Sequence, residues 1–389
     1  MKIQPANRIT DFKPYFFAQL NNRLIELRNQ GVDIIRLDMG SPDLPPESFI
    51  IDRLVESARR KDSHGYTQMG GTPGFLKAVS DYYRRRFKVE LDPRSQVLAL
   101  IGSKEGLFNL SQVLLNPGDT VLVPDPGYPV YRSSGLIAGA EIHEVPLLSE
   151  NNYLPKFDNI PSETAKKAKI LWLNYPNNPT GASATLDFFR EAVEFAREFE
   201  ILIAHDAPYV EIGFDGIQPP SILQIPGAED VCVEFNSLSK TYNMAGWRVG
   251  IAVGNPQVLQ LIHTYKSQID SSQFLPILEA GITALNGDQT WLVGRNNIYR
   301  DRRNLVHKAL KQINLKAALP TAGIYVWFSI PEKWEKSVEF CSSLLDATGV
   351  SITPGSVYGK FGEGFGRISL VTDTSRMAEA MQRMTAWVK

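Results

Sequence analysis

The chain has 389 residues, of which 43% are hydrophobic and 21% are charged. This length predicts two to three domains with a large buried core, and it excludes a small disulfide-stapled scaffold. The 41 Lys and Arg residues against 42 Asp and Glu give a net charge of −1, which offers no general attraction to nucleic acid or to an anionic membrane. Two cysteines, Cys232 and Cys341, are typical of a reducing compartment. With no apolar signal segment at the start and no apolar stretch long enough to cross a bilayer, we expect a soluble cytoplasmic protein.

Apolar β-rich runs alternate with amphipathic runs through the middle of the chain. This pattern predicts an α/β fold, with a mostly parallel sheet between two layers of helices. The candidate strands are nearly continuous in Val, Ile and Leu, as expected when both faces of a sheet are buried. They cover 97–101, 120–123, 170–174, 201–205, 231–236 and 249–253. Between them, 186–200 carries an apolar stripe at helical spacing and predicts a helix.

The last quarter of the chain predicts a second, smaller α+β domain. The expected elements, in chain order, are a helix over 291–310, a strand over 324–330, a helix over 334–348, a strand over 366–371 and a helix over 377–388. Gly349 is typical of a helix end. We therefore expect an N-terminal segment over 1–45 that packs with the small domain, a large domain over 46–285 and the small domain over 286–389, with a ligand cleft between the lobes.

The segment Ser237-Leu238-Ser239-Lys240 closes a predicted buried strand, and Arg248 follows eight positions later. Ligands bind at strand ends in α/β sheets. A lysine among small hydroxylated residues, with an arginine nearby, suits an amine that forms a Schiff base beside a phosphate site. The plain alternative is an exposed loop lysine.

Two further strand ends carry polar residues. Asp206 follows the strand over 201–205, and a carboxylate that leaves an apolar strand needs a partner because an unpaired buried charge is costly. A cationic cofactor nitrogen would be such a partner, and a helix N-cap is the alternative role. The run 174–181, Asn-Tyr-Pro-Asn-Asn-Pro-Thr-Gly, predicts a rigid turn that holds a side-chain amide in one orientation.

The turn Gly102-Ser103-Lys104-Glu105-Gly106 leads from a strand into a predicted helix over 107–115. Such a turn presents free backbone N–H groups and the positive end of the helix dipole to a phosphate, although many strand-to-helix turns look similar. It is neither a Walker loop nor a G-x-G-x-x-G fingerprint. After the next strand, Tyr128 is a candidate to lie over a flat cofactor, with an ordinary core aromatic as the alternative.

In this order and spacing, the motifs resemble those of the fold-type I pyridoxal-phosphate enzymes, specifically the class I/II aminotransferases. The resemblance runs from Gly40 to Ser369, nearly the full length. It implies a fold like that of aspartate aminotransferase, pyridoxal 5'-phosphate as the cofactor, amino transfer between an L-amino acid and a 2-oxo acid, and a homodimer with shared active sites. A β-lyase acting on C–S bonds shares the fold and its main residues, so it stays open. A pyridoxal-phosphate-binding regulator needs a DNA-binding head, which we do not expect in the 39 residues before Gly40.

The resemblance also implies roles for single residues. Lys240 would bond the cofactor and then act as a base, which its burial at a strand end would favour. Asp206 would pair with the pyridine nitrogen and keep it protonated, so that the ring accepts electrons from the substrate. Asn178 and Tyr209 would face the ring hydroxyl, and Tyr128 would stack on the ring.

Further roles concern the phosphate and the substrate. The phosphate would be surrounded by Gly102, Ser103, Lys104, Ser237, Ser239 and Arg248. Tyr66 would reach the phosphate of a neighbouring subunit. Arg367 would bind the substrate α-carboxylate through its planar fork, helped by Asn178 and the backbone at Gly40.

Other polar residues suggest no second site. The five histidines lack the i, i+4 spacing of a helical zinc site, so no metal is predicted. Strand alternation points His205 away from Asp206, as a packed core histidine. The basic runs at 84–86 and 166–167 are interpreted as solvated helix faces, and no aromatic platform for nucleic acid accompanies them.

Several strings resemble one subgroup, the LL-diaminopimelate aminotransferases, including those at 102–106 and 237–244. That resemblance implies transfer from LL-diaminopimelate to 2-oxoglutarate. The segment 266–274, expected near a neighbouring active site, departs from the pattern because asparagine and glycine are commoner there than Gln268 and Ser272. Aspartate or alanine aminotransferase activity therefore stays open. For the distal substrate group, the N-terminal candidates are Arg8, Tyr15 and Arg36, each with a structural role as the simpler interpretation.

Overall fold

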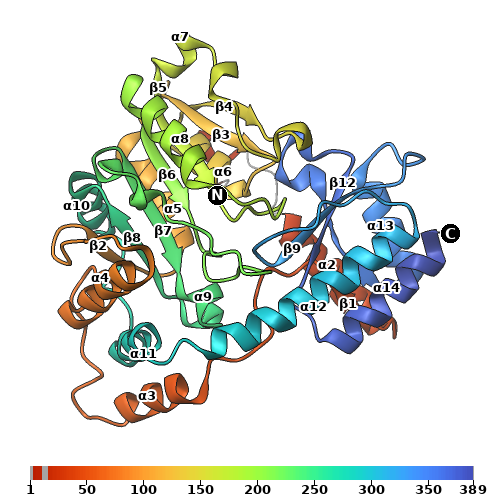
Figure 1. Ribbon diagram of the computed structural model, residues 1–389, viewed down its shortest axis with the longest axis horizontal. Coiled ribbons are helices and arrows are strands. Elements are labelled where there is room, and N and C mark those ends of the chain that lie inside the picture. The colour runs from red at the N-terminus through yellow and green to blue at the C-terminus, as the bar shows by residue number, and fades with distance from the viewer. Residues whose placement is uncertain (1–2, 11–15, 389) are drawn as a thin grey trace.

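The computed structural model describes residues 3–10 and 16–388, so Tyr15 lies outside the described residues (Figure 1). Its main sheet has seven strands in the order β2-β8-β7-β6-β5-β3-β4. Strand β8 is antiparallel to both of its neighbours, and the other pairings in this sheet are parallel. The bounds are β2 Val97–Leu100, β3 Thr120–Asp125, β4 Glu141–Pro146, β5 Ala168–Asn174, β6 Leu202–Asp206, β7 Cys232–Ser237 and β8 Gly250–Gly254. The predicted, mostly parallel sheet is confirmed.

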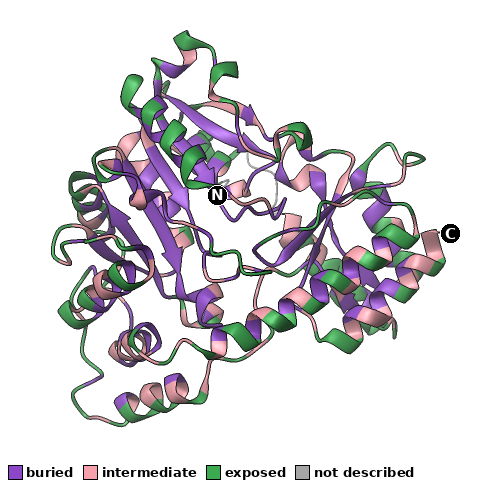
Figure 2. Ribbon diagram, in the orientation of Figure 1, coloured by how far each residue is buried: buried purple, intermediate pink, exposed green. Residues whose placement is uncertain are grey.

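Helices cover both faces of this sheet, and the alternation of strand side chains explains why. In β5, Leu171 and Leu173 join one apolar cluster, while Ile170 and Trp172 join the cluster on the opposite face. The first cluster includes helices α4 (Pro73–Phe87), α8 (Leu186–Glu198) and α11 (Leu275–Asn286), and the second includes α5 (Ser103–Leu114), α6 (Pro129–Ile137) and α10 (Pro256–Lys266). Helix α3 (Ser48–Ala58) packs on α11. Except for the edge strand β4, the strands are accordingly buried along almost their whole length (Figure 2). This is the predicted three-layer α/β/α arrangement.

A smaller antiparallel sheet, in the order β11-β12-β9, lies beside the large one (Figure 1). Its strands are β9 (Tyr325–Ser329), β11 (Thr353–Pro354) and β12 (Phe365–Ser369), and the helices around it are α12 (Trp291–Gln312), α13 (Ser337–Thr348) and α14 (Thr374–Val388). N-terminal residues pack here as well. Strand β1 (Ile35–Arg36) pairs in parallel with β10 (Val350–Ser351), and α2 (Phe16–Asn29) packs Leu24 and Leu27 against Leu345.

The remaining elements are short. They are α1 (Asn7–Thr10), α7 (Ser162–Ala165), α9 (Leu238–Thr241), and the 3-10 turns Ser149–Asn151, Phe157–Asn159, Ile222–Gln224, Ala228–Asp230, Ala245–Trp247, Gly355–Tyr358 and Lys360–Gly362. No helix within 3–10 and 16–388 has the length and apolar character needed to cross a membrane.

Several element boundaries differ from the sequence prediction. Strand β4 was not predicted, because Glu141, His143 and Glu144 interrupt its apolar pattern at the sheet edge. Helix α13 starts at Ser337 instead of 334, since Trp334 packs its ring against Phe340 and Trp387 before the helix begins. Helices α5 and α14 start four and three residues earlier than predicted, at Ser103 and Thr374. Gly349 ends α13 with φ +72°, as predicted.

Ser272 occupies a backbone conformation that favours glycine, with φ +73°. A residue with a Cβ atom in this left-handed region is destabilising by about 1–2 kcal/mol. Replacing it by glycine removes this cost, but glycine loses more backbone freedom on folding, which offsets part of the gain. We expect Ser272→Gly to raise the free energy of unfolding by about 0.5–1 kcal/mol in a urea titration. Ser272→Ala, which keeps the Cβ atom, should give no such gain, and an equal gain in both variants would contradict the backbone explanation.

Candidate active site

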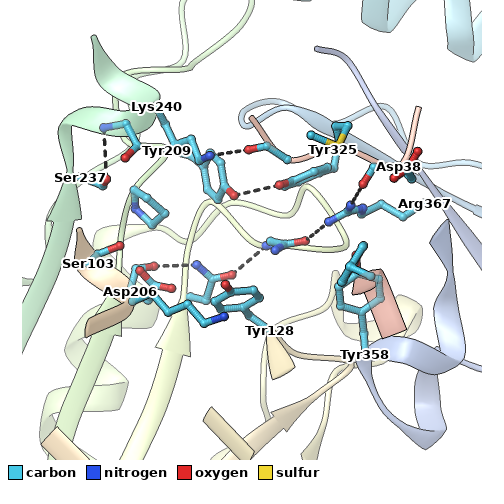
Figure 3. Close-up of a pocket in the computed structure, with 18 of the residues that line it drawn as sticks. Asp38, Ser103, Tyr128, Asp206, Tyr209, Ser237, Lys240, Tyr325, Tyr358 and Arg367 are labelled. Atoms are coloured by element: carbon cyan, nitrogen blue, oxygen red, sulfur yellow. Dashed lines mark hydrogen bonds between the residues drawn. The ribbon is translucent and has the colours of Figure 1, made fainter. Parts of the chain in front are cut away.

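A cavity of about 450 Å³ lies where β5, β6 and β7 end, between the large sheet and residues of β9 and β12 (Figure 3). This is the predicted cleft at the strand ends. The predicted site residues that line it are Gly40, Ser103, Lys104, Tyr128, Asn178, Asp206, Tyr209, Ser237, Ser239, Lys240, Arg248 and Arg367. Two predicted residues do not line it. Gly102 lies just behind, against the guanidinium of Arg248, and Tyr66 is 96% exposed on the surface.

Lys240 enters the cavity from the end of β7. Ser237 caps the short helix α9 by accepting a hydrogen bond from the backbone N–H of Ser239 at 3.1 Å, which fixes the turn that carries the lysine. The Lys240 Nζ donates to the backbone carbonyl of Gly40. Burial lowers the pKa of Lys240 to about 8, and repulsion from Arg248 and Arg367 contributes. The amine is therefore poised to give up a proton near neutral pH.

Asp206, the last residue of β6, holds a buried carboxylate that is only half satisfied. Its Oδ2 accepts a hydrogen bond from Tyr131 Oη at 2.6 Å, while Oδ1 has no hydrogen-bond partner among residues 3–10 and 16–388. Burial raises the pKa of Asp206 to about 6 even though the Tyr131 bond and the nearby Lys240 lower it. A buried carboxylate oxygen without a partner is costly, so this atom is suited to receive a cationic N–H group from a ligand.

His205, the preceding residue, faces the other side of the sheet as predicted. Its ring lies 4.9 Å from that of Phe189, and its two nitrogens contact Glu234 Oε2 at 2.9 Å and the Tyr175 carbonyl at 3.2 Å. His205 therefore belongs to the core and not to the cavity.

A chain of hydrogen bonds crosses the cavity floor from Asp206 to Arg367 (Figure 3). Asn174 Nδ2 donates to the Asp206 carbonyl at 2.6 Å, and Asn174 Oδ1 accepts from the Asn178 backbone N–H at 2.8 Å. Asn178 Oδ1 in turn accepts from Arg367 Nη1 at 2.8 Å. Because the carbonyl end of the Asn178 amide is held by Arg367, its NH₂ end is oriented as a donor for a ligand.

Arg367 is a buried guanidinium on β12, held in one orientation. Its Nη2 donates to the Asp38 carbonyl at 2.7 Å and to Thr353 Oγ1 at 3.2 Å, and its guanidinium carbon lies 4.1 Å from the ring centre of Tyr325. The Nε–H has no hydrogen-bond partner in the described part of the chain. A fixed, buried arginine with a donor to spare suits a carboxylate.

The Tyr325 hydroxyl also contacts Tyr209 and limits the space at Gly40. This hydroxyl lies 3.1 Å from that of Tyr209, and a Cβ atom built on Gly40 would approach it to 2.6 Å. Gly40 therefore has no room for a side chain, which lets its backbone come close to Lys240.

One end of the cavity gathers positive charge at the start of α5. Ser103 is the first residue of this helix, and Lys104 and Arg248 lie beside it. Burial, together with repulsion from Arg248, lowers the pKa of Lys104. The buried Ser239 Oγ has no hydrogen-bond partner among the residues described. Free backbone N–H groups, two cations and an unpaired hydroxyl fit a phosphate.

Sequence reasoning missed several residues of the site. Tyr131 holds Asp206, Asn174 orients Asn178, and Tyr325 and Tyr358 flank Arg367 at 4.1 and 5.1 Å from its guanidinium carbon. Asn174 stands in the turn motif that the sequence singled out, so its position was a usable signal. The tyrosines carry no such signal, because their contacts are long-range in sequence.

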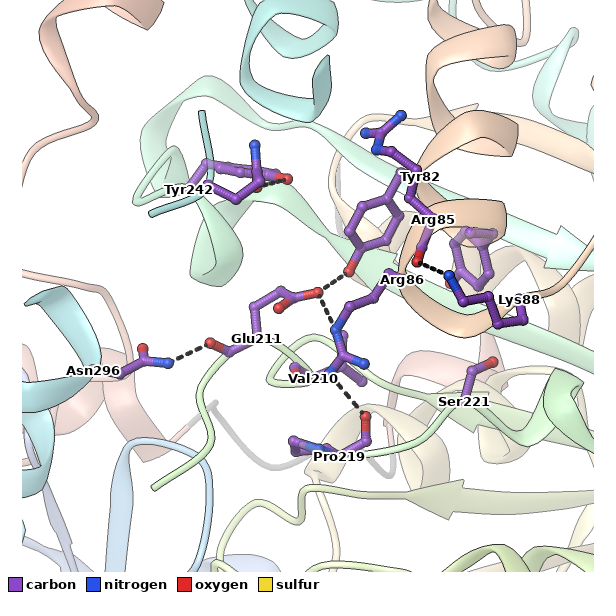
Figure 4. A network of polar contacts seen from close by, with 12 residues as sticks. Tyr82, Arg85, Arg86, Lys88, Val210, Glu211, Pro219, Ser221, Tyr242 and Asn296 are labelled. Carbon is purple, nitrogen blue, oxygen red and sulfur yellow. Dashed lines mark hydrogen bonds and ion pairs between the residues drawn. The ribbon is translucent and has the colours of Figure 1, made fainter. Parts of the chain in front are cut away.

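Arg295 of α12 fixes the segment that carries Lys240. Its Nη1 donates to the backbone carbonyls of Lys240, at 3.1 Å, and Thr241. These carbonyls end the one-turn helix α9 and lack helical partners. The Arg295 Nη2 donates to the Glu211 carbonyl at 2.8 Å, and this carbonyl also accepts a hydrogen bond from Asn296 at 2.8 Å (Figure 4). The helix that leads to the smaller sheet thus supports the lysine directly.

The basic run at 84–86 was predicted to be a solvated helix face. Arg84 and Arg85 are exposed as predicted, whereas Arg86 is partly buried. Arg86 donates to Glu211 Oε1 at 3.1 Å and to the Pro219 carbonyl at 3.2 Å (Figure 4), and Arg85 donates to the Leu285 carbonyl at 2.6 Å. These residues anchor α4 to neighbouring segments because buried carbonyl and carboxylate groups there need donors.

The raised pKa of Asp206 predicts a pH-dependent cost in the cofactor-free protein. The rise of this pKa from the ordinary 3.8 to about 6 lowers the free energy of unfolding by about 3 kcal/mol when the carboxyl is ionised. This destabilisation is absent below pH 3.8 and complete above pH 6. Asp206→Asn does not titrate. We expect the cofactor-free variant to be more stable than the cofactor-free wild type at pH 8, with a difference that shrinks as the pH falls to 4. Thermal unfolding of both proteins between pH 4 and pH 8 measures this difference in stability. A difference that does not change with pH would contradict ionisation of Asp206 as its cause.

Comparison with known proteins places this site in a family. Residues 32–384 match the family of aminotransferases of class I and II. The LL-diaminopimelate aminotransferase of Moorella thermoacetica is 45% identical over 382 residues, 98% of each chain, and that of Syntrophobacter fumaroxidans is 46% identical over 384 residues, 99% of each chain. Substrate-bound BacF of Bacillus subtilis has a TM-score of 0.96 at 36% identity, covering 100% of this chain and 98% of its own. The chain therefore belongs to the class I and II aminotransferases, enzymes of fold type I that transfer amino groups with pyridoxal 5'-phosphate.

Proposed function

We propose that this aminotransferase takes the amino group of LL-diaminopimelate and passes it to 2-oxoglutarate, with the resulting oxo acid cyclising to tetrahydrodipicolinate. The observation that carries this proposal is the 45–46% identity to LL-diaminopimelate aminotransferases over 98–99% of both chains. Identity spread over the whole length favours a shared substrate more than a shared fold alone does.

We further propose how the cavity residues hold the cofactor, whose ring accepts electrons from the substrate α-carbon when it is bound. The unpaired Oδ1 of Asp206 would receive the pyridine N–H, and the Asn178 amide and Tyr209 hydroxyl would donate to the ring oxygen. Tyr128 would stack on the ring. Lys240 would bond the cofactor and, once displaced, would move a proton at the substrate α-carbon, a role that its pKa of about 8 supports.

The charged end of the cavity would hold the phosphate. Its proposed ligands are the side chains of Ser103, Lys104, Ser237, Ser239 and Arg248, and Tyr66 from a neighbouring subunit. Gly102, whose N–H donates to the Leu100 carbonyl at 2.8 Å, would contribute by leaving room for the Arg248 guanidinium. Arg367 would bind the substrate α-carboxylate through the donor that Nε keeps available, with Asn178 and Gly40 beside it.

We propose a homodimer because Tyr66 is 96% exposed, and Met69, Ile269 and Phe274 are also exposed, at 42%, 56% and 41%. Apolar and aromatic exposure of this kind is typical of an interface. We also propose domain boundaries near 45 and 286, supported by separate apolar clusters for the two sheets, and a cytoplasmic location, supported by two buried free cysteines.

An amino-donor panel tests the proposed reaction. The holoenzyme is given 2-oxoglutarate with LL-diaminopimelate, aspartate or alanine, and the oxo acid products are identified. We expect LL-diaminopimelate to give the highest kcat/KM. A higher value for aspartate or alanine would overturn the substrate. Release of pyruvate, ammonia and sulfide from L-cysteine, given to the holoenzyme without 2-oxoglutarate, would establish a β-lyase instead.

A further inference from the structure

One cation of the cavity has no role in the chemistry proposed above. Among the described residues that line the cavity, the positively charged side chains are Arg36, Lys104, Lys240, Arg248 and Arg367. Four of these serve the cofactor or the α-carboxylate. Arg36 comes from β1, in the N-terminal segment, and its side chain keeps 21% of its surface exposed.

The Arg36 guanidinium is held in place by two neighbours. Its Nε and Nη2 donate to the two carboxylate oxygens of Asp38 at 3.2 and 2.6 Å, and its Nη1 donates to Asn21 Oδ1 at 3.2 Å. These bonds use three of its five N–H groups and leave one on each terminal nitrogen. The Asp38 side chain is fully buried, so its carboxylate orients Arg36 without being presented to a ligand.

Asp38 also links Arg36 to Arg367. The same residue accepts from Arg36 through its side chain and from Arg367 Nη2 through its backbone carbonyl, at 2.7 Å (Figure 3). Two fixed guanidinium groups therefore line one cavity on either side of a single residue. A ligand with one carboxylate on Arg367 therefore has a second guanidinium, that of Arg36, within the same cavity.

We propose that Arg36 binds the distal carboxylate of dicarboxylic substrates, as a specificity-determining residue. The proposal rests on the proposed function, because LL-diaminopimelate and 2-oxoglutarate both carry a second carboxylate beyond the reacting carbon. The partial neutralisation by Asp38 keeps the affinity moderate, which lets each product leave, while the two remaining N–H groups distinguish a carboxylate from an alkyl end. The other N-terminal candidate in the described residues, Arg8, is exposed on α1 and does not line the cavity.

Binding of two unreactive acids to the holoenzyme tests this inference. Glutarate and pentanoate have five carbon atoms each, and only glutarate has a distal carboxylate. By calorimetry we expect the wild type to bind glutarate at least tenfold more tightly. Arg36→Met should remove most of this preference by weakening glutarate and leaving pentanoate within twofold. A preference that survives in Arg36→Met, or a wild type with no preference, would overturn the proposal.

Two further variants secure the interpretation. Arg36→Lys keeps the charge beside Asp38 but loses the planar fork, so it should fold and retain only part of the preference. Arg23→Met is the matched control, because Arg23 lies on α2, pairs with Asp346 at 3.1 Å and does not line the cavity. It should keep the wild-type preference. Since neither acid is a substrate, the result is independent of which amino donor the enzyme uses, so a failure here and a failure of the donor panel are distinguishable.

Discussion

Replacing Lys240 with alanine should lower the rate of amino transfer by at least about 10⁴-fold while the fold persists, since a positioned general base alone contributes up to about that factor. The lysine would also supply the bond to the cofactor, so two contributions disappear together. The fold should survive because, among the described residues, the Lys240 Nζ makes one hydrogen bond, to Gly40, and the helix that carries it is fixed by Ser237 and Arg295.

Single-turnover kinetics with excess enzyme measure this loss. The matched control is Lys336→Ala, an exposed lysine with 66% of its side chain accessible, which should react at the wild-type rate. Added methylamine should restore part of the activity of Lys240→Ala, because a free amine can occupy the space and act as the missing base. Unchanged amino transfer in the variant would remove Lys240 from the mechanism.

The large sheet was predictable because its buried strands are rich in apolar residues. Both faces of β5 are covered by helices, so its residues 170–173 form a continuous apolar run. Strand β4 lies at the edge with one neighbour, and its polar residues need no apolar pattern. The two-residue strands β1, β10 and β11 are too short for any period to appear, and they exist because distant segments meet.

The site was predictable where a strand ends in a polar residue, as at Asp206 and Lys240. It was not predictable where a partner arrives from far along the chain. Tyr131 is 75 residues from Asp206, and the Asn178 that holds Arg367 is 189 residues away. Arg36 was named from its N-terminal position alone. Its place in the cavity depends on the pairing of β1 with β10, which no local pattern encodes.

Removing the guanidinium in Arg367→Ala should weaken amino acids by about 10²–10³-fold in Kd, as expected when a buried charge pair loses one partner. The matched comparison is a substrate from which the carboxylate has been removed. In an absorbance titration of the holoenzyme, the amine that lacks the carboxylate should bind the wild type weakly. Its Kd for Arg367→Ala should be no higher than its Kd for the wild type.

Arg367→Lys keeps the positive charge and should recover only a small part of the affinity. An ammonium group cannot hold the contacts with Asn178, Asp38 and Tyr325 and keep a fixed donor for the substrate as well. The loss thus depends on the fork and its orientation by Asn178 and Asp38 more than on charge alone. If the amine were weakened as much as the amino acid, the effect of Arg367 would be one of packing between the two sheets, and the α-carboxylate would have to bind elsewhere in the cavity.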